Sequence, residues 1–145
     1  MAGSFFTPRM FLIVGGVVLL LLGIVGYLNI FTKEAFPSFY LTPGENVAHV
    51  GLGIIALAAV FVPGLNSALA PYYRWIVLLV GVIALFFGLY GFVVANNPDP
   101  NTFGVANLEI VDNLIHLVVA AWAFASAWSS RPAMEPGMSG MSGMR

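Results

Sequence analysis

The chain has 145 residues, of which 60% are hydrophobic and only 8% are charged, and its mean hydropathy is +0.96. A soluble chain of this size needs about 25% charged residues to cover its surface, so this composition excludes a water-soluble protein and indicates an integral membrane protein. The net charge of −1, with five Lys and Arg in total, argues against a nucleic-acid partner, which needs a dense basic surface. The sequence contains no cysteine, which excludes disulfides, thiolate metal sites and thiol catalysis.

Four apolar runs are long enough to cross a bilayer as helices, because a helical span needs roughly 20 apolar residues. They cover residues 10–30, 44–62, 75–95 and 108–128. The segments between them are rich in Pro, Asn, Asp and Gly, which is typical of connections outside the membrane. The sequence therefore predicts an all-α fold, an integral membrane four-helix bundle of two hairpins within residues 1–129. Residues 130–145 are predicted to form a flexible tail of Met, Gly and Ser.

The distribution of basic residues predicts the orientation of these spans. Cytoplasmic loops carry an excess of Lys and Arg. Four basic residues lie on one side of the predicted spans, namely Arg9, Arg74, Arg131 and Arg145, against only Lys33 on the other. Both termini are therefore expected in the cytoplasm. The first run is longer than the apolar core of a signal peptide and no small-residue cleavage site follows it, so we expect it to remain as a span.

Three glycines of the first span recur 65 residues later in the third span. They are Gly16, Gly23 and Gly26, with Gly81, Gly88 and Gly91 as their counterparts. Helices in a membrane associate by close packing, which small residues allow, so each set is expected to face a neighbouring helix. A glycine-lined groove for a flat cofactor or a lipid is the alternative. Together with a second pattern that recurs 67 residues apart, the glycines predict two parallel helical-hairpin repeats related by a pseudo-twofold axis.

The second pattern is an acid-Asn-x-x-His motif near the start of the second and fourth spans. It comprises Glu45, Asn46 and His49 in the second span and Asp112, Asn113 and His116 in the fourth, and these are the only histidines of the sequence. Each carboxylate precedes its histidine by one helical turn on the same face. Ionisable groups inside a membrane are costly, and they usually face the bundle interior and pair with one another. These six residues are therefore the candidate site.

Three interpretations of the six residues are open. In the structural interpretation, which we favour, they form one hydrogen-bonded cluster that joins the second and fourth spans. In the tetrapyrrole interpretation, each histidine is an axial ligand of haem or chlorophyll, the acid fixes its tautomer and the small residues below it make room for the ring. In the relay interpretation, the acid–histidine pairs move a proton or an ion. No other metal-ligand spacing and no activated nucleophile is recognisable, so no metal site and no enzymatic activity are predicted.

The segments ENVAHVGLG and DNLIHLVVA resemble the pattern of a family of small bacterial four-helix membrane proteins, domain of unknown function 4383 (DUF4383). That family carries N-x-x-H-[LV] near the start of the second and fourth spans, and the resemblance extends from about Arg9 to Ser129. It implies residence in the bacterial plasma (inner) membrane and implies no activity. The fourth-span motif departs from the second because no Gly-Leu-Gly follows its histidine.

The sequence thus predicts a small non-catalytic structural or accessory subunit without a cofactor. Its expected partners are membrane lipid and either other integral membrane proteins or further copies of itself. The alternative is a subunit of a photosynthetic or respiratory complex that binds haem or bacteriochlorophyll through His49 and His116.

Overall fold

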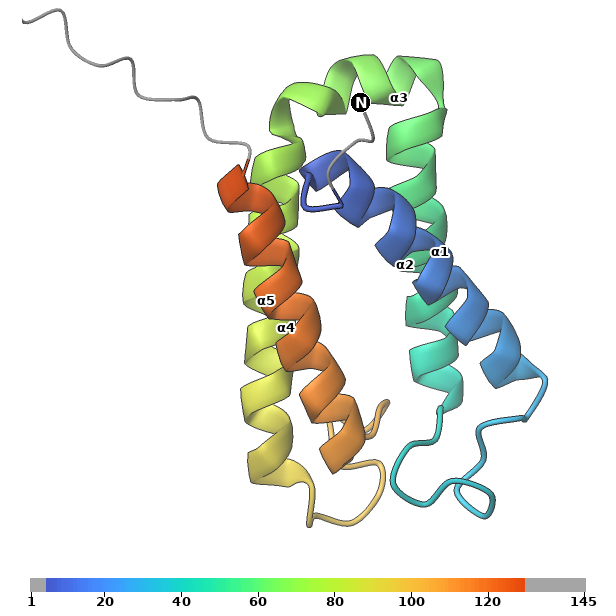
Figure 1. Cartoon of the computed structure of the whole chain (residues 1–145). Coiled ribbons are helices and arrows are strands. Elements are labelled where there is room, and N and C mark those ends of the chain that lie inside the picture. Colours follow the sequence, from blue (N-terminus) through green and yellow to red (C-terminus); the bar gives the residue numbers. More distant parts are fainter. Residues whose placement is uncertain (1–4, 130–145) are drawn as a thin grey trace, which may run out of the picture.

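The computed structural model describes residues 5–129, which form helices joined by loops (Figure 1). The long helices are α1 (Pro8–Tyr27), α2 (Pro43–Phe61), α4 (Tyr73–Val94) and α5 (Ile110–Ser129). Each of them lies in a helical stretch that is long and apolar enough to cross a membrane. The protein is therefore an all-α, four-span membrane protein. The predicted tail, residues 130–145, lies outside the described residues.

The starts of α1 and α2 follow from local sequence. Thr7 precedes Pro8, and its hydroxyl accepts a hydrogen bond from the backbone N–H of Met10 at 3.2 Å. Thr42 precedes Pro43 in the same way and shares a reciprocal capping box with Glu45. Proline suits the first helical position because its missing N–H would have no helical partner there. Threonine then supplies an acceptor for one of the free N–H groups of the first turn.

The long helices form two hairpins, since α1 packs along α2 and α4 packs along α5. Figure 1 shows that α1 and α4 run in one direction and α2 and α5 in the other. Contacts between the hairpins are made mainly by α1 with α4 and α5. The hairpins lie close together at the end where the short helix α3 crosses, called here the α3 end (Figure 1). They diverge toward the opposite end, called here the loop end, which carries residues 28–42 and 95–109.

The connection between α2 and α4 is helical, although its composition suggested a turn-forming loop. It consists of α3 (Pro63–Leu69) followed by a 3-10 turn over Ala70–Tyr72. The Asn66 amide donates to the carbonyl of Val60 at 2.8 Å, and the Tyr73 hydroxyl donates to the carbonyl of Ala59 at 2.6 Å. The last carbonyls of a helix have no partner within it. The connection therefore satisfies the end of α2 and holds it beside the start of α4.

A hydrophobic core joins the two hairpins at the α3 end. Its buried members come from all four long helices, and they are Phe11, Leu12, Val60, Tyr73, Val77, Ala123 and Ala127. The ring of Trp122 adds to this core, because it lies 4.5 Å from the ring of Phe11 and stacks on Phe5 at 4.9 Å between ring centroids. Such contacts act in a membrane through close packing, since lipid is as apolar as the side chains.

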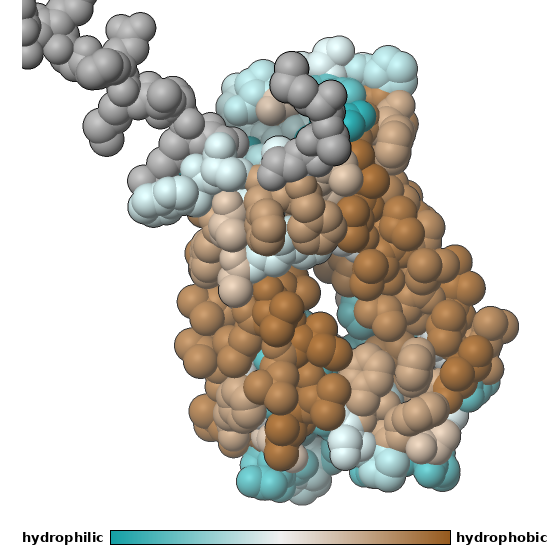
Figure 2. All heavy atoms as spheres, in the orientation of Figure 1, coloured by the Kyte–Doolittle hydropathy of each residue, from teal (hydrophilic) through white to brown (hydrophobic). Residues whose placement is uncertain are grey.

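The visible surface matches a membrane-embedded protein. Figure 2 shows hydrophobic residues around the middle of the molecule and hydrophilic residues gathered at both ends. Large apolar side chains are exposed along all four long helices, as at Leu21, Ile55, Leu89 and Val118. The polar motif side chains of the membrane-spanning helices therefore lie toward the inside of the fold.

Candidate functional site

The two motif asparagines point into their own hairpins. Asn46 is 4% exposed and lies over Gly26, where an added methyl group would stand 1.8 Å from Asn46 Oδ1. Asn113 is 0% exposed and lies over Gly91, where an added methyl group would stand 1.7 Å from Asn113 Oδ1. Each amide thus occupies the space that a side chain would fill. The asparagines consequently belong to helix packing inside each hairpin and not to a cluster between the hairpins.

The other glycines also meet the neighbouring helix of the same hairpin. A methyl group on Gly23 would lie 2.9 Å from the Asn46 carbonyl, and one on Gly88 would lie 3.1 Å from the Asn113 carbonyl. Gly16 faces Ala56 and Leu57, as Gly81 faces Ala123 and Phe124. A side chain at these positions would hold the backbones apart. In the described chain, the six repeated glycines are therefore covered by the neighbouring helix of their own hairpin.

The four ionisable motif residues line one cavity between the hairpins, with a volume of about 340 Å³. Glu45 and His49 reach it from α2, and Asp112 and His116 reach it from α5. Among the described residues, no hydrogen bond joins either member of the α2 pair to either member of the α5 pair. The structure thus differs from the expected single hydrogen-bonded cluster, because the hairpins diverge toward the loop end and leave space between these side chains.

The two acid–histidine pairs differ in geometry. Glu45 Oε2 accepts the backbone N–H and the hydroxyl of Thr42, each at 2.6 Å, so this carboxylate caps α2. His49 Nδ1 is buried without a hydrogen-bond partner in the described chain. In the second pair, His116 Nδ1 lies 3.3 Å from Asp112 Oδ2 and 3.0 Å from the Asp112 carbonyl oxygen. Asp112 therefore orients the His116 ring and leaves Nε2 as its available nitrogen.

Apolar side chains form the remaining walls of the cavity. They come from α1, α2, α4 and α5, and they include Leu19, Leu52, Val80, Ile83, Phe87 and Val119. Residues of the α4–α5 loop, among them Thr102 and Val105, line its loop end. Figure 2 shows a hollow between the two halves of the molecule with hydrophilic surface inside it. The cavity is thus an apolar space with a few ionisable groups, as ligand pockets commonly are.

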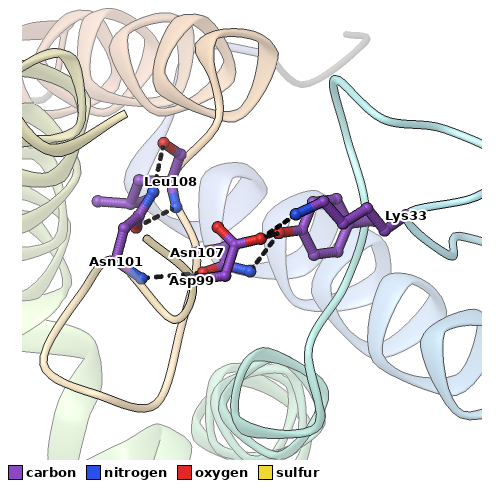
Figure 3. A network of polar contacts seen from close by, with 6 residues as sticks. Lys33, Asp99, Asn101, Asn107 and Leu108 are labelled. Carbon is purple, nitrogen blue, oxygen red and sulfur yellow. Dashed lines mark hydrogen bonds and ion pairs between the residues drawn. The ribbon is translucent and has the colours of Figure 1, made fainter. Parts of the chain in front are cut away.

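A polar network that the sequence analysis missed joins the hairpins at the loop end (Figure 3). Asp99 Oδ2 pairs with the Lys33 ammonium and accepts the Tyr40 hydroxyl at 2.7 Å. The amide of Asn107 donates to the oxygen of Tyr40. Asn101 holds the same loop in shape by accepting the Leu108 N–H at 2.9 Å. Lys33 and Tyr40 precede α2 whereas the others precede α5, so the network ties one hairpin to the other.

Breaking this network is expected to release the loops from each other. The hydrogen bond from Lys33 holds the pKa of Asp99 below its usual 3.8, and Asp99 raises the pKa of Lys33 above its usual 10.5. A carboxylate with a lowered pKa contributes stability above its unfolded pKa, and that contribution is lost as the pH falls through the folded value. We therefore expect the loops to separate below about pH 3.8 in the natural protein and already at neutral pH in Asp99→Asn.

Spin labels on the cysteines of Ser38→Cys and Asn97→Cys would measure the distance between the two loops. The natural sequence has no cysteine that would also be labelled. Glu34→Gln is the matched control, because Glu34 is an exposed carboxylate next to Lys33 in the sequence, on the α1–α2 loop. Identical distance distributions for Asp99→Asn and Glu34→Gln would contradict the role of the network.

The model of the family described as "Domain of unknown function (DUF4383)" matches residues 9–129 of the chain. No curated protein and no solved structure matches the chain. The matched segment contains both hairpins, the glycine–asparagine contacts and all residues that line the cavity.

Proposed function

The chain belongs to the DUF4383 family, and we propose that it is a non-catalytic accessory protein of the bacterial plasma membrane that binds a small ligand between its two hairpins. The cavity of about 340 Å³ carries this proposal, because the four ionisable residues of the repeated motif line it together. Ligand pockets typically measure about 300–1,000 Å³ and combine apolar walls with a few polar groups. Ionisable side chains inside a membrane are costly and typically mark a functional site.

We also propose that the two hairpins are copies of one ancestral unit, with both termini in the cytoplasm. The repeated contacts support this origin: Asn46 lies over Gly26 as Asn113 lies over Gly91. In both hairpins the carbonyl of the same asparagine lies next to a second glycine, Gly23 or Gly88. The distribution of Arg and Lys in the sequence supports the orientation.

Binding without catalysis is proposed because the hydroxyl groups near the acid–histidine pairs are already engaged. The Thr42 hydroxyl donates to Glu45 Oε2 at 2.6 Å, and the Thr102 hydroxyl donates to Asn101 Oδ1 at 2.9 Å. A nucleophilic hydroxyl needs a neighbouring base that takes its proton. Neither threonine is hydrogen-bonded to a histidine in the described chain. The carboxylate that the Thr42 hydroxyl meets also accepts the Thr42 backbone N–H at 2.6 Å, so it serves as the cap of α2. The motif is therefore better suited to hold a ligand than to attack one.

A tetrapyrrole is the second candidate ligand, favoured by the way Asp112 orients His116. The packing below the histidines supports a smaller ligand. A methyl group on Gly53 would lie 2.8 Å from the backbone nitrogen of Leu20, and Ala120 is 2% exposed. Neighbouring helices thus fill the stripes of small residues that would have to make room for a macrocycle.

Partner binding stays a prediction, and the packing of the glycines restricts which surface a partner could contact. All six repeated glycines are covered within their own hairpins. A partner subunit or a second copy would therefore meet the large apolar side chains on the outer faces of the helices.

Filling the cavity is expected to remove the ligand. Ala48 lines the cavity on α2, so the larger side chain of Ala48→Phe would occupy part of its volume. We expect the protein purified from its native membrane in mild detergent to retain about one bound small molecule per chain, and Ala48→Phe to retain about tenfold less. Mass spectrometry of the extracted molecules measures this loss, and the absorption spectrum of the same sample reports any tetrapyrrole.

Ala121→Phe is the matched control, since Ala121 is exposed on α5 and does not line the cavity. It should retain the molecule at the level of the natural protein. Equal retention by both variants would contradict the binding function.

A further inference from the structure

The charges around the cavity restrict what it can bind. Its described lining contains two carboxylates, Glu45 and Asp112, and two imidazoles, His49 and His116, but no Lys or Arg. When both carboxylates are ionised, the lining carries two negative charges if the imidazoles are neutral and none if both imidazoles are protonated. With ionised carboxylates the lining is therefore not positive in sum, and electrostatic interactions are strong in such a low-dielectric space. A cationic group is attracted, whereas an anionic one is opposed.

Each hairpin also presents a carboxylate oxygen that lacks a hydrogen-bond donor. Asp112 is 8% exposed and lines the cavity, and its Oδ2 accepts no hydrogen bond from the described residues, its nearest partner being His116 Nδ1 at 3.3 Å. Both hydrogen bonds to Glu45 end on Oε2, so Oε1 receives none from the described chain. A buried acceptor without a donor, such as Asp112 Oδ2, is costly. A ligand with several N–H donors would satisfy both carboxylates.

The rest of the cavity requires an apolar body. Glu45 and Asp112 are each the third residue of their helix, so the carboxylates lie near the loop end. Leu52, Ile83 and Phe87 line the cavity as well, and their side chains offer only apolar contact. An amphiphile would thus place its polar group toward the loop end and its apolar part among these side chains.

We propose, on the basis of the proposed binding function, that the cavity takes a lipophilic amine. Its ammonium group lies between the carboxylates of Glu45 and Asp112, and its apolar body lies against Leu52, Ile83 and Phe87. An ammonium group has three donors and no acceptor, which matches two carboxylates that need donors. Two kinds of molecule carry such an ammonium group on an apolar body: a free lipophilic amine and a phospholipid with an ethanolamine headgroup.

The two histidines make a direct test possible, since they are the only ones in the chain and both line the cavity. The full chain, labelled with ¹⁵N at histidine and held in phosphatidylglycerol nanodiscs at pH 7, is titrated with 4-phenylbutylamine, 4-phenylbutanol and 4-phenylbutanoate. These probes share a skeleton and differ in charge. We expect the amine to shift both imidazole signals to saturation, the alcohol to bind about tenfold more weakly, and the carboxylate to cause no shift. A second set of nanodiscs, containing phosphatidylethanolamine and no added amine, tests the lipid source.

Two variants test whether the carboxylates are responsible for binding of the amine. Glu45→Gln keeps the capping box, because glutamine also suits that position, and Asp112→Asn keeps the side-chain shape. Each should weaken amine binding about tenfold, whereas Glu34→Gln, which changes a carboxylate outside the cavity, should not. If the alcohol or the carboxylate binds as tightly as the amine, or if Glu45→Gln and Asp112→Asn both bind it normally, the amine proposal is overturned while the binding function stands. No response to any probe, together with equal retention by Ala48→Phe and Ala121→Phe, would overturn both.

Discussion

Gly91→Ala is expected to destabilise the protein strongly, because its new methyl group would stand 1.7 Å from Asn113 Oδ1. Asn113 is 0% exposed, so its amide is enclosed by the surrounding protein and cannot turn outward without displacing neighbours. Overpacking of this kind typically costs about 1–3 kcal/mol, and the severity of this contact places the expected loss near the upper end. Denaturation of the purified protein in detergent micelles, followed by circular dichroism, would measure the free energy of unfolding.

Two further variants separate this contact from the general effect of alanine in a helix. Gly15→Ala adds the same methyl group within α1, where it meets nothing within 4 Å. We expect it to raise stability by about 0.5–1 kcal/mol, because alanine loses less backbone entropy than glycine. Adding Asn113→Ala to Gly91→Ala should restore part of the lost stability, since it removes the clashing amide. Equal stabilities of Gly91→Ala and Gly15→Ala would refute the contact.

Phe11→Ala is expected to loosen the junction between the hairpins. Phe11 is 4% exposed and packs in the core at the α3 end, with its ring 4.5 Å from that of Trp122. Removing a buried phenylalanine usually costs about 3–5 kcal/mol in a soluble core. The packing share of that cost persists in a membrane, so we expect a loss of about 3 kcal/mol.

The spread between the hairpins can be measured directly with spin labels. Val47 on α2 and Val118 on α5 are exposed, and the absence of natural cysteines leaves cysteines introduced there as the only labelled sites. Phe11→Ala should broaden the distance distribution between them. Phe92→Ala removes the same atoms from an exposed position of α4 and should leave it narrow. A narrow distribution in both variants would show that other contacts hold the hairpins together.

Part of the candidate site was recognisable before any tertiary contact was known. The repeated glycines and the acid-Asn-x-x-His motif are signals at fixed spacing, and all of these residues lie in the interior of the hairpins or around the cavity. The different structural roles of these residues were not recognisable from the sequence. Spacing shows that Asn46 and His49 lie near each other on α2, but the neighbouring helix decides that the amide meets Gly26 while the imidazole lines the cavity.

Local sequence is enough to specify the membrane class, the four spans and the starts of α1 and α2. These properties depend on hydropathy summed over about 20 neighbouring residues and on caps made within a single helical turn. Two features depend on tertiary packing: the hairpins diverge around a cavity, and Asp99 on the α4–α5 loop pairs with Lys33 on the α1–α2 loop. Such contacts join segments 66 residues apart, and they arise from the packing angle of whole helices, which no local pattern specifies.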